Sequence, residues 1–394
     1  MRILVDDNVA FATEAFSSFG EVVTMPGVDI TSDHLKGIDA LVVRSATKVD
    51  EDLLKGSSVT FVGTATSGSD HVDKDYLKAN GIAFADAHGS NAESVAEWTI
   101  AALLEACERK GKTDIGALAF GVVGVGSVGT MLADRFAGLT CRIRRCDPPR
   151  AREEDSQGDF LPLSDVLATS DVVSINVPLK MNEPYATYHM IARGALVRMR
   201  SGSWMMNSSR GPVVDNEALL ECLADKQIDA CVMDVWEDEP TPNPDLINAV
   251  TLATPHIAGH SFDGKVAGTQ MIVDALSKFT GKSSEWDSEA ILAEGTDKLM
   301  LKIPAGAEEM ERTAFMQALV KQMYDVTRDE AEILKIAELK TEKARGERFD
   351  RYRHDYPVRR SWSRWSVKEA DVPEDYRKEV AAALLVNLIP DEDE

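Results

Sequence analysis

Three side chains of types that could together catalyse a hydride transfer follow short apolar runs in the middle of the chain. Arg210 lies in an S-R-G-P segment, Glu239 in D-V-W-E-D-E-P and His256 in P-H-I-A-G. Oxidation of a 2-hydroxy acid needs a base for the hydroxyl proton, a partner that orients the base, and a fixed cation for the substrate carboxylate. An imidazole titrates near neutral pH, a carboxylate stabilises its charged form, and a guanidinium fork matches a carboxylate. His256, Glu239 and Arg210 are therefore predicted to fill these three roles.

A glycine-rich loop precedes these segments and is typical of dinucleotide binding. Gly124, Gly126 and Gly129 form G-x-G-x-x-G directly after an apolar run and before a helical pattern. The first glycine permits a tight turn, the second lets backbone N–H groups approach a pyrophosphate, and the third lets the helix pack on the sheet. Asp147 ends the next apolar run, where a carboxylate binds the ribose hydroxyls and repels the 2′-phosphate of NADP. Together they predict NAD as the cofactor, against the plainer alternative of a glycine turn and a surface aspartate.

Taken singly, each catalytic candidate is more often structural, because a lone arginine or histidine on a loop usually lies at the surface. All three follow the nucleotide loop in the chain and lie close to Gly or Pro. Ligands of dinucleotide folds bind at the carboxyl ends of the strands, where such loops gather. The combination therefore favours an active site over three unrelated surface residues.

The elements that must position these residues are short strands alternating with helices. The first set of strands is expected at Arg2–Val5, Ala40–Val43, Thr60–Gly63 and Ile82–Phe84. The second set is expected at Leu118–Val123, Arg142–Cys146, Val172–Asn176, Ser203–Asn207, Ala230–Val235 and Val250–Ala253. This alternation predicts an α/β fold with parallel sheets. A helix at Ser261–Lys278 could return the chain to the first set of strands.

After Thr280 the pattern changes. A strand is expected at Lys298–Ile303, a helix at Ala307–Tyr324 and a closing helix at Glu374–Ile389, before an acidic tail at 391–394. A basic segment with interleaved aromatic residues lies between the last two helices. The apolar face of the helix at Ala307–Tyr324 is small for an independent core. It could pack against a second copy of the chain, which predicts a homodimer, or against its own nucleotide domain.

Composition limits the partners and the compartment. The 394 residues carry a net charge of −23, so nucleic acid and anionic membranes are expected to be repelled, and no apolar run is long enough to span a bilayer. The five cysteines are scattered without a C-x-x-C pair, which indicates reduced thiols in a cytoplasm and no metal site. The N-terminus begins at once as a strand, with no leader expected. A solvated or salt-tolerant surface is the preferred explanation of the acidity itself.

These motifs resemble those of the D-2-hydroxyacid dehydrogenases. The resemblance rests on the nucleotide loop and on S-R-G-P, D-V-W-x-x-E-P and P-H-I-A-G. Other segments are most similar to the branch of that family that oxidises 4-phospho-D-erythronate in vitamin B6 biosynthesis. They include V-R-S-A-T-K-V at 43–49, F-V-G-T-A-T-S-G-S-D-H-V-D at 61–73 and Y-D-V-T-R-D at 324–329. The similarity covers nearly the whole chain and fades after Trp365.

The resemblance implies two Rossmann-like, doubly wound parallel-sheet domains plus a small α+β C-terminal dimerisation domain. Residues 1–98 and 257–280 would form a discontinuous substrate-binding domain, 99–256 the NAD-binding domain and 281–394 the dimerisation domain. The reaction would be oxidation of the substrate at C2 with reduction of NAD. Catalysis would depend on Arg210, Glu239 and His256.

The resemblance also assigns the binding residues. The cofactor positions are Gly124, Gly126, Ser127, Val128, Gly129, Asp147, Val177, Ser208, Asp234 and Gly259. The substrate positions are Arg44, Ser45, Thr66 and His260. Val177 stands where many relatives have Thr, which leaves only a backbone contact to NAD. His260 stands where the most similar relatives have Tyr.

Two basic clusters could bind the substrate phosphate, which needs a local positive pocket in so acidic a protein. Arg44 and Lys48 follow a strand of the first set, on the edge where such folds bind ligands. The second cluster lies in the C-terminal basic segment and comprises Arg351, Arg353, Arg359 and Arg360. The first cluster is preferred, although Arg44 could instead form an ion pair with Asp6 or Asp7.

Two other functions are compatible with these motifs. A sister enzyme acting on 3-phosphoglycerate shares the catalytic residues, but its regulatory C-terminal domain would be expected to show a βαββαβ pattern that is not found here. A non-catalytic NAD sensor on the same fold would not need Arg210, Glu239 and His256 together. Both remain alternatives to the phosphoerythronate reaction.

Overall fold

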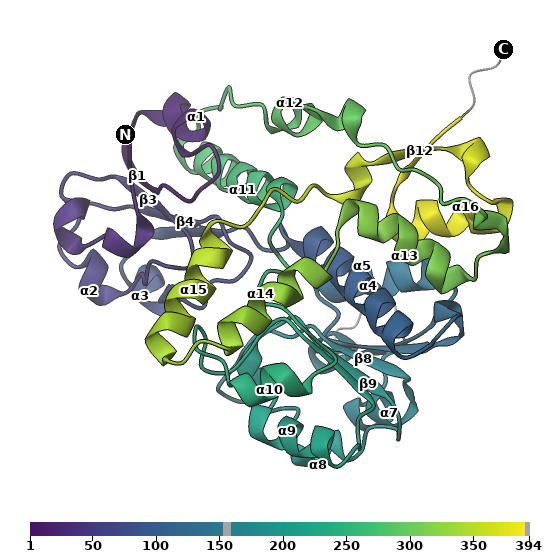
Figure 1. Ribbon diagram of the computed structural model, residues 1–394. Coiled ribbons are helices and arrows are strands. Elements are labelled where there is room, and N and C mark those ends of the chain that lie inside the picture. The colour runs from purple at the N-terminus through teal and green to yellow at the C-terminus, as the bar shows by residue number, and fades with distance from the viewer. Residues whose placement is uncertain (153–158, 391–394) are drawn as a thin grey trace. The chain divides into compact units, whose positions relative to one another are not determined.

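The computed structural model describes residues 1–152 and 159–390 and shows an α/β protein (Figure 1). The predicted acidic tail at 391–394 lies outside the described residues. Contacts between residues divide the chain into two units: a first unit of Met1–Ala92 and His260–Asp297, and a second unit of Glu93–Gly259 and Lys298–Glu394. Each unit contains one large parallel sheet, which confirms the predicted fold class.

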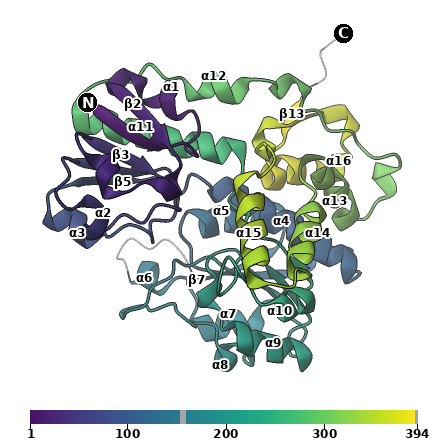
Figure 2. The same cartoon turned by 60° about the vertical axis from the view of Figure 1, so that its left-hand side comes forward.

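The first unit is built on a parallel sheet of strand order β2-β1-β3-β4-β5. Figure 2 shows this sheet with its strands β2, β3 and β5 labelled. The strands are β1 (Arg2–Asp6), β2 (Glu21–Met25), β3 (Ala40–Val43), β4 (Phe61–Thr64) and β5 (Ala83–Asp86). The helices are α1 (Ala12–Phe16), α2 (Glu51–Leu54), α3 (Lys74–Ala79), α11 (Phe262–Thr280) and α12 (Ser288–Ala293). Ile272 and Leu276 of α11 pack with Ile3 and Val5 on one face, so a late segment of the chain completes the first unit's core.

The second unit contains a parallel sheet of strand order β11-β10-β9-β8-β6-β7. The strands are β6 (Ala119–Val123), β7 (Arg142–Cys146), β8 (Val172–Ile175), β9 (Trp204–Asn207), β10 (Ala230–Met233) and β11 (Leu252–Ala253). The helices that accompany the sheet are α4 (Ala92–Arg109), α5 (Ser127–Gly138), α6 (Pro148–Ala151), α7 (Leu163–Thr169), α8 (Arg193–Leu196), α9 (Asn216–Ala224) and α10 (Pro244–Ala249). The strand order reverses at β6, and this is the point where doubly wound sheets bind ligands.

The C-terminal part of the second unit is mostly helical. Its elements are α13 (Arg312–Met323), α14 (Thr327–Ala337), α15 (Glu342–His354), α16 (Glu374–Glu379), β12 (Ser366–Lys368) and β13 (Asn387–Ile389). The expected strand at Lys298–Ile303 is wrong, because only Met300 forms a bridge, to Ser366, while the backbone N–H and carbonyl of Lys302 bind the side-chain amide of Gln322 instead of a strand. The expected closing helix is also too long: the helical segment ends at Leu384, since Leu385 adopts a left-handed conformation with φ 56°.

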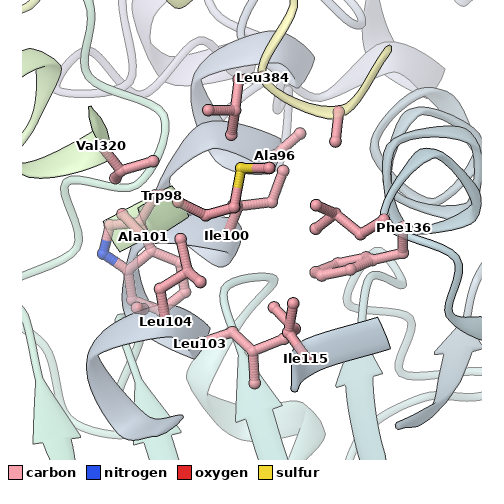
Figure 3. Packing of buried hydrophobic residues seen from close by; sticks show 14 of the residues in the cluster. Ala96, Trp98, Ile100, Ala101, Leu103, Leu104, Ile115, Phe136, Val320 and Leu384 are labelled. Carbon is pink, nitrogen blue, oxygen red and sulfur yellow. The ribbon is translucent and has the colours of Figure 1, made fainter. Parts of the chain in front are cut away.

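The C-terminal part shares its core with the nucleotide-binding sheet and its helices. Figure 3 shows Val320 and Leu384 directed into the same apolar space as Ala96, Trp98 and Phe136. The apolar face of α13 is therefore buried inside the second unit. This face therefore does not need a second copy of the chain to be buried, and the homodimer itself stays a prediction.

Candidate active site

Every catalytic and cofactor candidate in the second unit follows the carboxyl end of a strand or lies in the loop and helix start behind it. The glycine-rich loop follows β6, Asp147 follows β7, Arg210 follows β9, Glu239 follows β10 and His256 follows β11. All six strands of this sheet run parallel, so these ends share one edge. The sheet thus gathers residues that lie far apart in the sequence.

Glu239 and His256 form a short hydrogen-bonded pair. The Nδ1 atom of His256 lies 2.6 Å from Oε2 of Glu239. The other carboxylate oxygen, Oε1, accepts a hydrogen bond of 2.8 Å from the backbone N–H of Trp236. Burial raises the pKa of Glu239, but attraction to His256 and the hydrogen bond between them outweigh burial and hold that pKa below its ordinary value. The carboxylate therefore stays charged and fixes the imidazole with Nε2 directed away from it.

Asp234 holds the loop that carries His256. Its Oδ1 accepts from the N–H of Ile257 at 2.8 Å and its Oδ2 from the N–H of Ala258 at 2.9 Å. The hydroxyl of Thr254 also donates to Oδ1, at 2.6 Å. Burial raises the pKa of Asp234, and these three donors, together with attraction to His256, oppose that shift. Asp234 thus positions the histidine loop, and its predicted contact with NAD stays a prediction.

Arg210 lies on a loop that packs directly on the loop of Glu239. Its Nη1 donates a hydrogen bond of 2.8 Å to the carbonyl of Ser209. A Cβ atom on Gly211 would lie 1.8 Å from the carbonyl oxygen of Trp236, so only glycine permits this approach. Asn207 closes the loop by donating from Nδ2 to the carbonyl of Arg210 at 3.1 Å. The three predicted catalytic residues are thus held on adjacent strand ends of one sheet.

The glycine-rich loop has the geometry that a dinucleotide requires. Gly124 has φ 86°, in the left-handed region that glycine favours. A Cβ atom on Gly129 would lie 2.0 Å from the carbonyl oxygen of Gly124, whereas one on Gly126 would meet no atom within 4 Å. Gly126 is the N-cap of α5 and has no side chain to cover the first N–H groups of the helix. The open space beside these N–H groups fits a pyrophosphate, and α5 starts with the predicted cofactor residues Ser127 and Val128.

Asp147 braces the glycine-rich loop from the end of β7. Its Oδ2 accepts from the N–H of Val125 at 2.8 Å, and its Oδ1 accepts from the N–H of Arg150 at 3.1 Å. The guanidinium of Arg150 folds back onto the same loop and donates to the carbonyl of Val125. A carboxylate at this edge of the loop fits the ribose hydroxyls of NAD.

The remaining cofactor candidates of the second unit border the same strand ends. A methyl group of Val177 lies 2.7 Å from the point where a Cβ atom on Gly124 would stand, so Val177 packs over the nucleotide loop. Ser208 follows β9, two residues before Arg210, and Gly259 ends the loop of His256. The structure therefore brings together all the second-unit candidates, while the substrate candidates Arg44, Ser45, Thr66 and His260 belong to the first unit.

Within the first unit, Arg44, Ser45 and Thr66 follow the carboxyl ends of the neighbouring strands β3 and β4. The guanidinium of Arg44 donates to the carbonyl of Ala65 at 3.3 Å, whereas Asp6 binds only its backbone N–H. The hydroxyl of Thr66 donates to the carbonyl of Gly68 at 2.8 Å. Arg44 is thus directed along the loop after β4 and does not form the ion pair with Asp6.

Lys265 on α11 is a cation that sequence reasoning missed. Burial lowers its pKa, and the neighbouring charge of Arg44 lowers it further. Arg44 and Lys265 are therefore close enough for their charges to interact within the first unit. One sequence feature could have indicated that Lys265 lies near Arg44: the helix expected at Ser261–Lys278, which could return the chain to the first set of strands.

Comparison with known proteins identifies the family. Residues 90–258 match the family described as D-isomer specific 2-hydroxyacid dehydrogenase, NAD binding domain. The chain is 42% identical to erythronate-4-phosphate dehydrogenase of Salinibacter ruber, across 98% of this chain and 99% of that protein. It is 41% identical to the protein of that name from Pectobacterium carotovorum, across 94% and 95%. The chain belongs to the family of erythronate-4-phosphate dehydrogenases.

Solved structures support the fold of this erythronate-4-phosphate dehydrogenase family member. D-lactate dehydrogenase from Aquifex aeolicus, complexed with NAD and lactic acid, is 24% identical, with a TM-score of 0.59 across 71% of this chain and 96% of that one. The family match at residues 90–258 confirms the predicted resemblance to D-2-hydroxyacid dehydrogenases and the predicted cofactor, NAD. Within the described residues, no helix is both long and apolar enough to cross a bilayer.

Proposed function

We propose that this protein oxidises 4-phospho-D-erythronate at C2 to (R)-3-hydroxy-2-oxo-4-phosphobutanoate with NAD, a step of pyridoxine and pyridoxal 5′-phosphate biosynthesis. The observation that carries the proposal is the pair of His256 and Glu239, 2.6 Å apart, on the sheet edge that also holds the glycine-rich loop. The name shared by relatives that match 94% to 98% of the chain supports this substrate.

The chain's own residues account for the proton and the substrate carboxylate. Nδ1 of His256 donates to Glu239, so Nε2 is the ring atom that takes the C2 hydroxyl proton. The charged Glu239 then stabilises the imidazolium, and the Arg210 guanidinium holds the substrate carboxylate and polarises the forming carbonyl. NAD, when bound, would supply the acceptor for the hydride that leaves C2. Gly124, Gly126, Gly129 and Asp147 would hold it.

We assign the substrate phosphate to the cations of the first unit. Arg44 and Lys265 provide the local positive charge that a phosphate ester needs in a protein of net charge −23. The rival cluster is less suited, because Arg359 is only 4% exposed and its Nη2 donates to two backbone carbonyls. Ser45, Thr66 and His260 are proposed as further substrate contacts.

Two broader properties belong to the same proposal. We infer a homodimer, although the apolar face of α13 no longer argues for it. We also infer a cytoplasmic protein, because all five cysteines are free and buried. The small hydroxy acid is its expected partner.

The decisive experiment compares substrates by absorbance of NADH at 340 nm. The purified protein should oxidise 4-phospho-D-erythronate with a kcat/KM at least about tenfold above that for 3-phosphoglycerate, because the phosphate distance differs between the two acids. A preference for 3-phosphoglycerate would assign the chain to the sister activity. NAD binding without turnover of any 2-hydroxy acid would favour the non-catalytic sensor.

A further inference from the structure

The basic aromatic segment, residues 340–365, reaches the loop of the catalytic histidine. Arg353, near the end of α15, donates from Nε to the carbonyl of His256 at 3.1 Å. Arg359 donates from Nη2 to the carbonyl of Ala258 at 2.6 Å and to that of Ser94 at 3.1 Å. Two arginines of this segment thus bind the carbonyl side of the loop whose N–H groups bind Asp234.

The loop needs such support because its backbone is strained. His256 has φ 55°, in the left-handed region that a side chain with Cβ rarely adopts. Such a conformation costs on the order of 1 kcal/mol and persists only where the surroundings hold it. Asp234 binds the N–H groups of Ile257 and Ala258, while Arg353 binds the carbonyl of His256 itself. The strained residue is therefore fixed from both sides.

The basic aromatic segment is itself anchored by a buried carboxylate. Asp329 of α14 accepts hydrogen bonds from three tyrosine hydroxyls: Tyr324 at 2.5 Å, Tyr352 at 2.5 Å and Tyr356 at 2.9 Å. Tyr352 precedes Arg353 on α15, and the Arg359 guanidinium lies 4.5 Å from the ring centre of Tyr324. These tyrosines attach α15 and the residues after it to α14. The backbone that carries Arg353 and Arg359 is therefore held in place.

A second tie links the same segment to α4. The backbone N–H of Trp362 donates to Oε1 of the Glu97 carboxyl group at 2.6 Å, and the indole ring of Trp362 is fully buried. These contacts explain why basic and aromatic residues are interleaved at 340–365. The aromatic side chains fix the segment in the core, and its arginines reach the catalytic loop.

We propose that Arg353 and Arg359 are positioning residues, which hold the carbonyls of the 256–259 loop and so keep His256 aligned with Glu239 for proton transfer. This inference rests on the proposed function of His256. The rival role, direct binding of the substrate phosphate by Arg353, would affect substrate affinity instead of the alignment of the base.

The test replaces Arg353, which is half-buried and less needed for the core than Arg359. Arg353→Ala should lower kcat by about 10- to 100-fold, because small displacements of a catalytic group are costly, and should leave KM for the hydroxy acid within about twofold. Arg353→Lys should recover part of the loss, since an ammonium group can donate to the same carbonyl. Lys343→Ala is the matched control, because it removes an exposed cation from the same helix.

A second measurement does not depend on turnover. The proton between His256 and Glu239, in a short hydrogen bond, should give a downfield imidazole resonance in the proton NMR spectrum, assigned by its loss in His256→Gln. Arg353→Ala should shift or broaden this resonance. The corresponding resonance of His189, which lies 2.6 Å from Glu237, should not move and serves as an internal reference.

The outcomes separate the two proposals. Wild-type kcat in Arg353→Ala together with an unmoved His256 resonance would overturn the positioning role, and so would a raised KM with unchanged kcat. If Arg353→Ala does not fold by circular dichroism, Arg353→Gln provides the same two readings. A wild-type protein that turns over no hydroxy acid would refute the proposed function, whereas a resonance that moves in Arg353→Ala would still support the positioning contact.

Discussion

The second unit contains two carboxylate–imidazole pairs that are nearly alike in local geometry. Glu239–His256 and Glu237–His189 both have a closest oxygen–nitrogen distance of 2.6 Å. The histidine side chains are 29% and 31% exposed. Both histidines also have positive φ, 55° and 47°. Distance, exposure and backbone conformation therefore fail to distinguish the pair predicted to be catalytic from the other pair.

The two pairs differ in which ring nitrogen of the histidine faces the carboxylate. His256 presents Nδ1 to Glu239 and, among the described residues, has no hydrogen-bond partner at Nε2. His189 presents Nε2 to Glu237, and its Nδ1 lies 3.9 Å from a carboxylate oxygen of Asp215. Both nitrogens of His189 are thus directed at acidic side chains, whereas one nitrogen of His256 remains for a substrate. Glu237 also accepts from the N–H of Asn216, at 2.9 Å, so this pair closes a junction between two loops.

The largest expected difference between the pairs lies in turnover. His256→Gln should lower kcat by about 10²- to 10⁴-fold, the usual cost of removing a general base, with little change in NAD affinity. His189→Gln should keep kcat within about twofold and lower the free energy of unfolding by about 1 kcal/mol, because it removes one hydrogen bond. Steady-state kinetics and urea unfolding of both variants check this. Near-wild-type turnover in His256→Gln would remove the distinction.

Replacing the two glutamates should also affect kcat differently, with the larger loss at Glu239, but the difference should be smaller than for the two histidines. Glu239→Gln keeps the shape of the side chain and removes the charge that stabilises the imidazolium, so kcat should fall by about 10²-fold, the lower end of the range for acid–base catalysis. Glu237→Gln should leave kcat within about twofold. Equal losses in the two variants, measured at saturating NAD, would show that both pairs contribute to the chemistry.

The smallest expected effect is on the pH dependence of stability and comes from a buried acidic side chain that has no histidine partner. Glu97, on α4, is fully buried, and burial raises its pKa to about 8 from an ordinary value of 4.5. The folded protein therefore binds a proton at Glu97 that the unfolded chain releases, and stability falls as the pH rises from 4.5 to about 8. In Glu97→Gln this fall should be shallower. Urea unfolding at pH 5 and pH 8 measures the loss of unfolding free energy. An equal loss in the wild type and in Glu97→Gln would contradict the raised pKa of Glu97.

The parts of the site that depend on strand ends were predictable from the sequence. Buried β-branched runs identify the strands of a parallel sheet, and loops after such strands must share an edge, which brings His256 and Glu239 together. The nucleotide loop was likewise predictable, because its glycine spacing lies within one short segment between a strand and a helix. Edge strand β2 was missed because its residues are half-exposed and lack a continuous apolar run.

Contacts made by side chains over long sequence separations could not be predicted in this way. Arg353 reaches the carbonyl of a residue 97 positions earlier, and no periodicity in 340–365 encodes that partner. His189 and Glu237 likewise pair across 48 positions, and neither lies in a recognisable motif with the other. Such contacts follow from how helices and loops pack once the sheet has formed, so they require coordinates.

The central claim is that His256 removes the hydroxyl proton while the hydride leaves C2 of a phosphorylated 2-hydroxy acid. The most direct measurement uses 4-phospho-D-erythronate deuterated at C2, with the reduced cofactor analysed by proton NMR. The account predicts one deuterium at C4 of the nicotinamide ring, and a rate in His256→Gln at least about 10²-fold below wild type. NADH without deuterium, or deuterium transfer at an unchanged rate in His256→Gln, would contradict it.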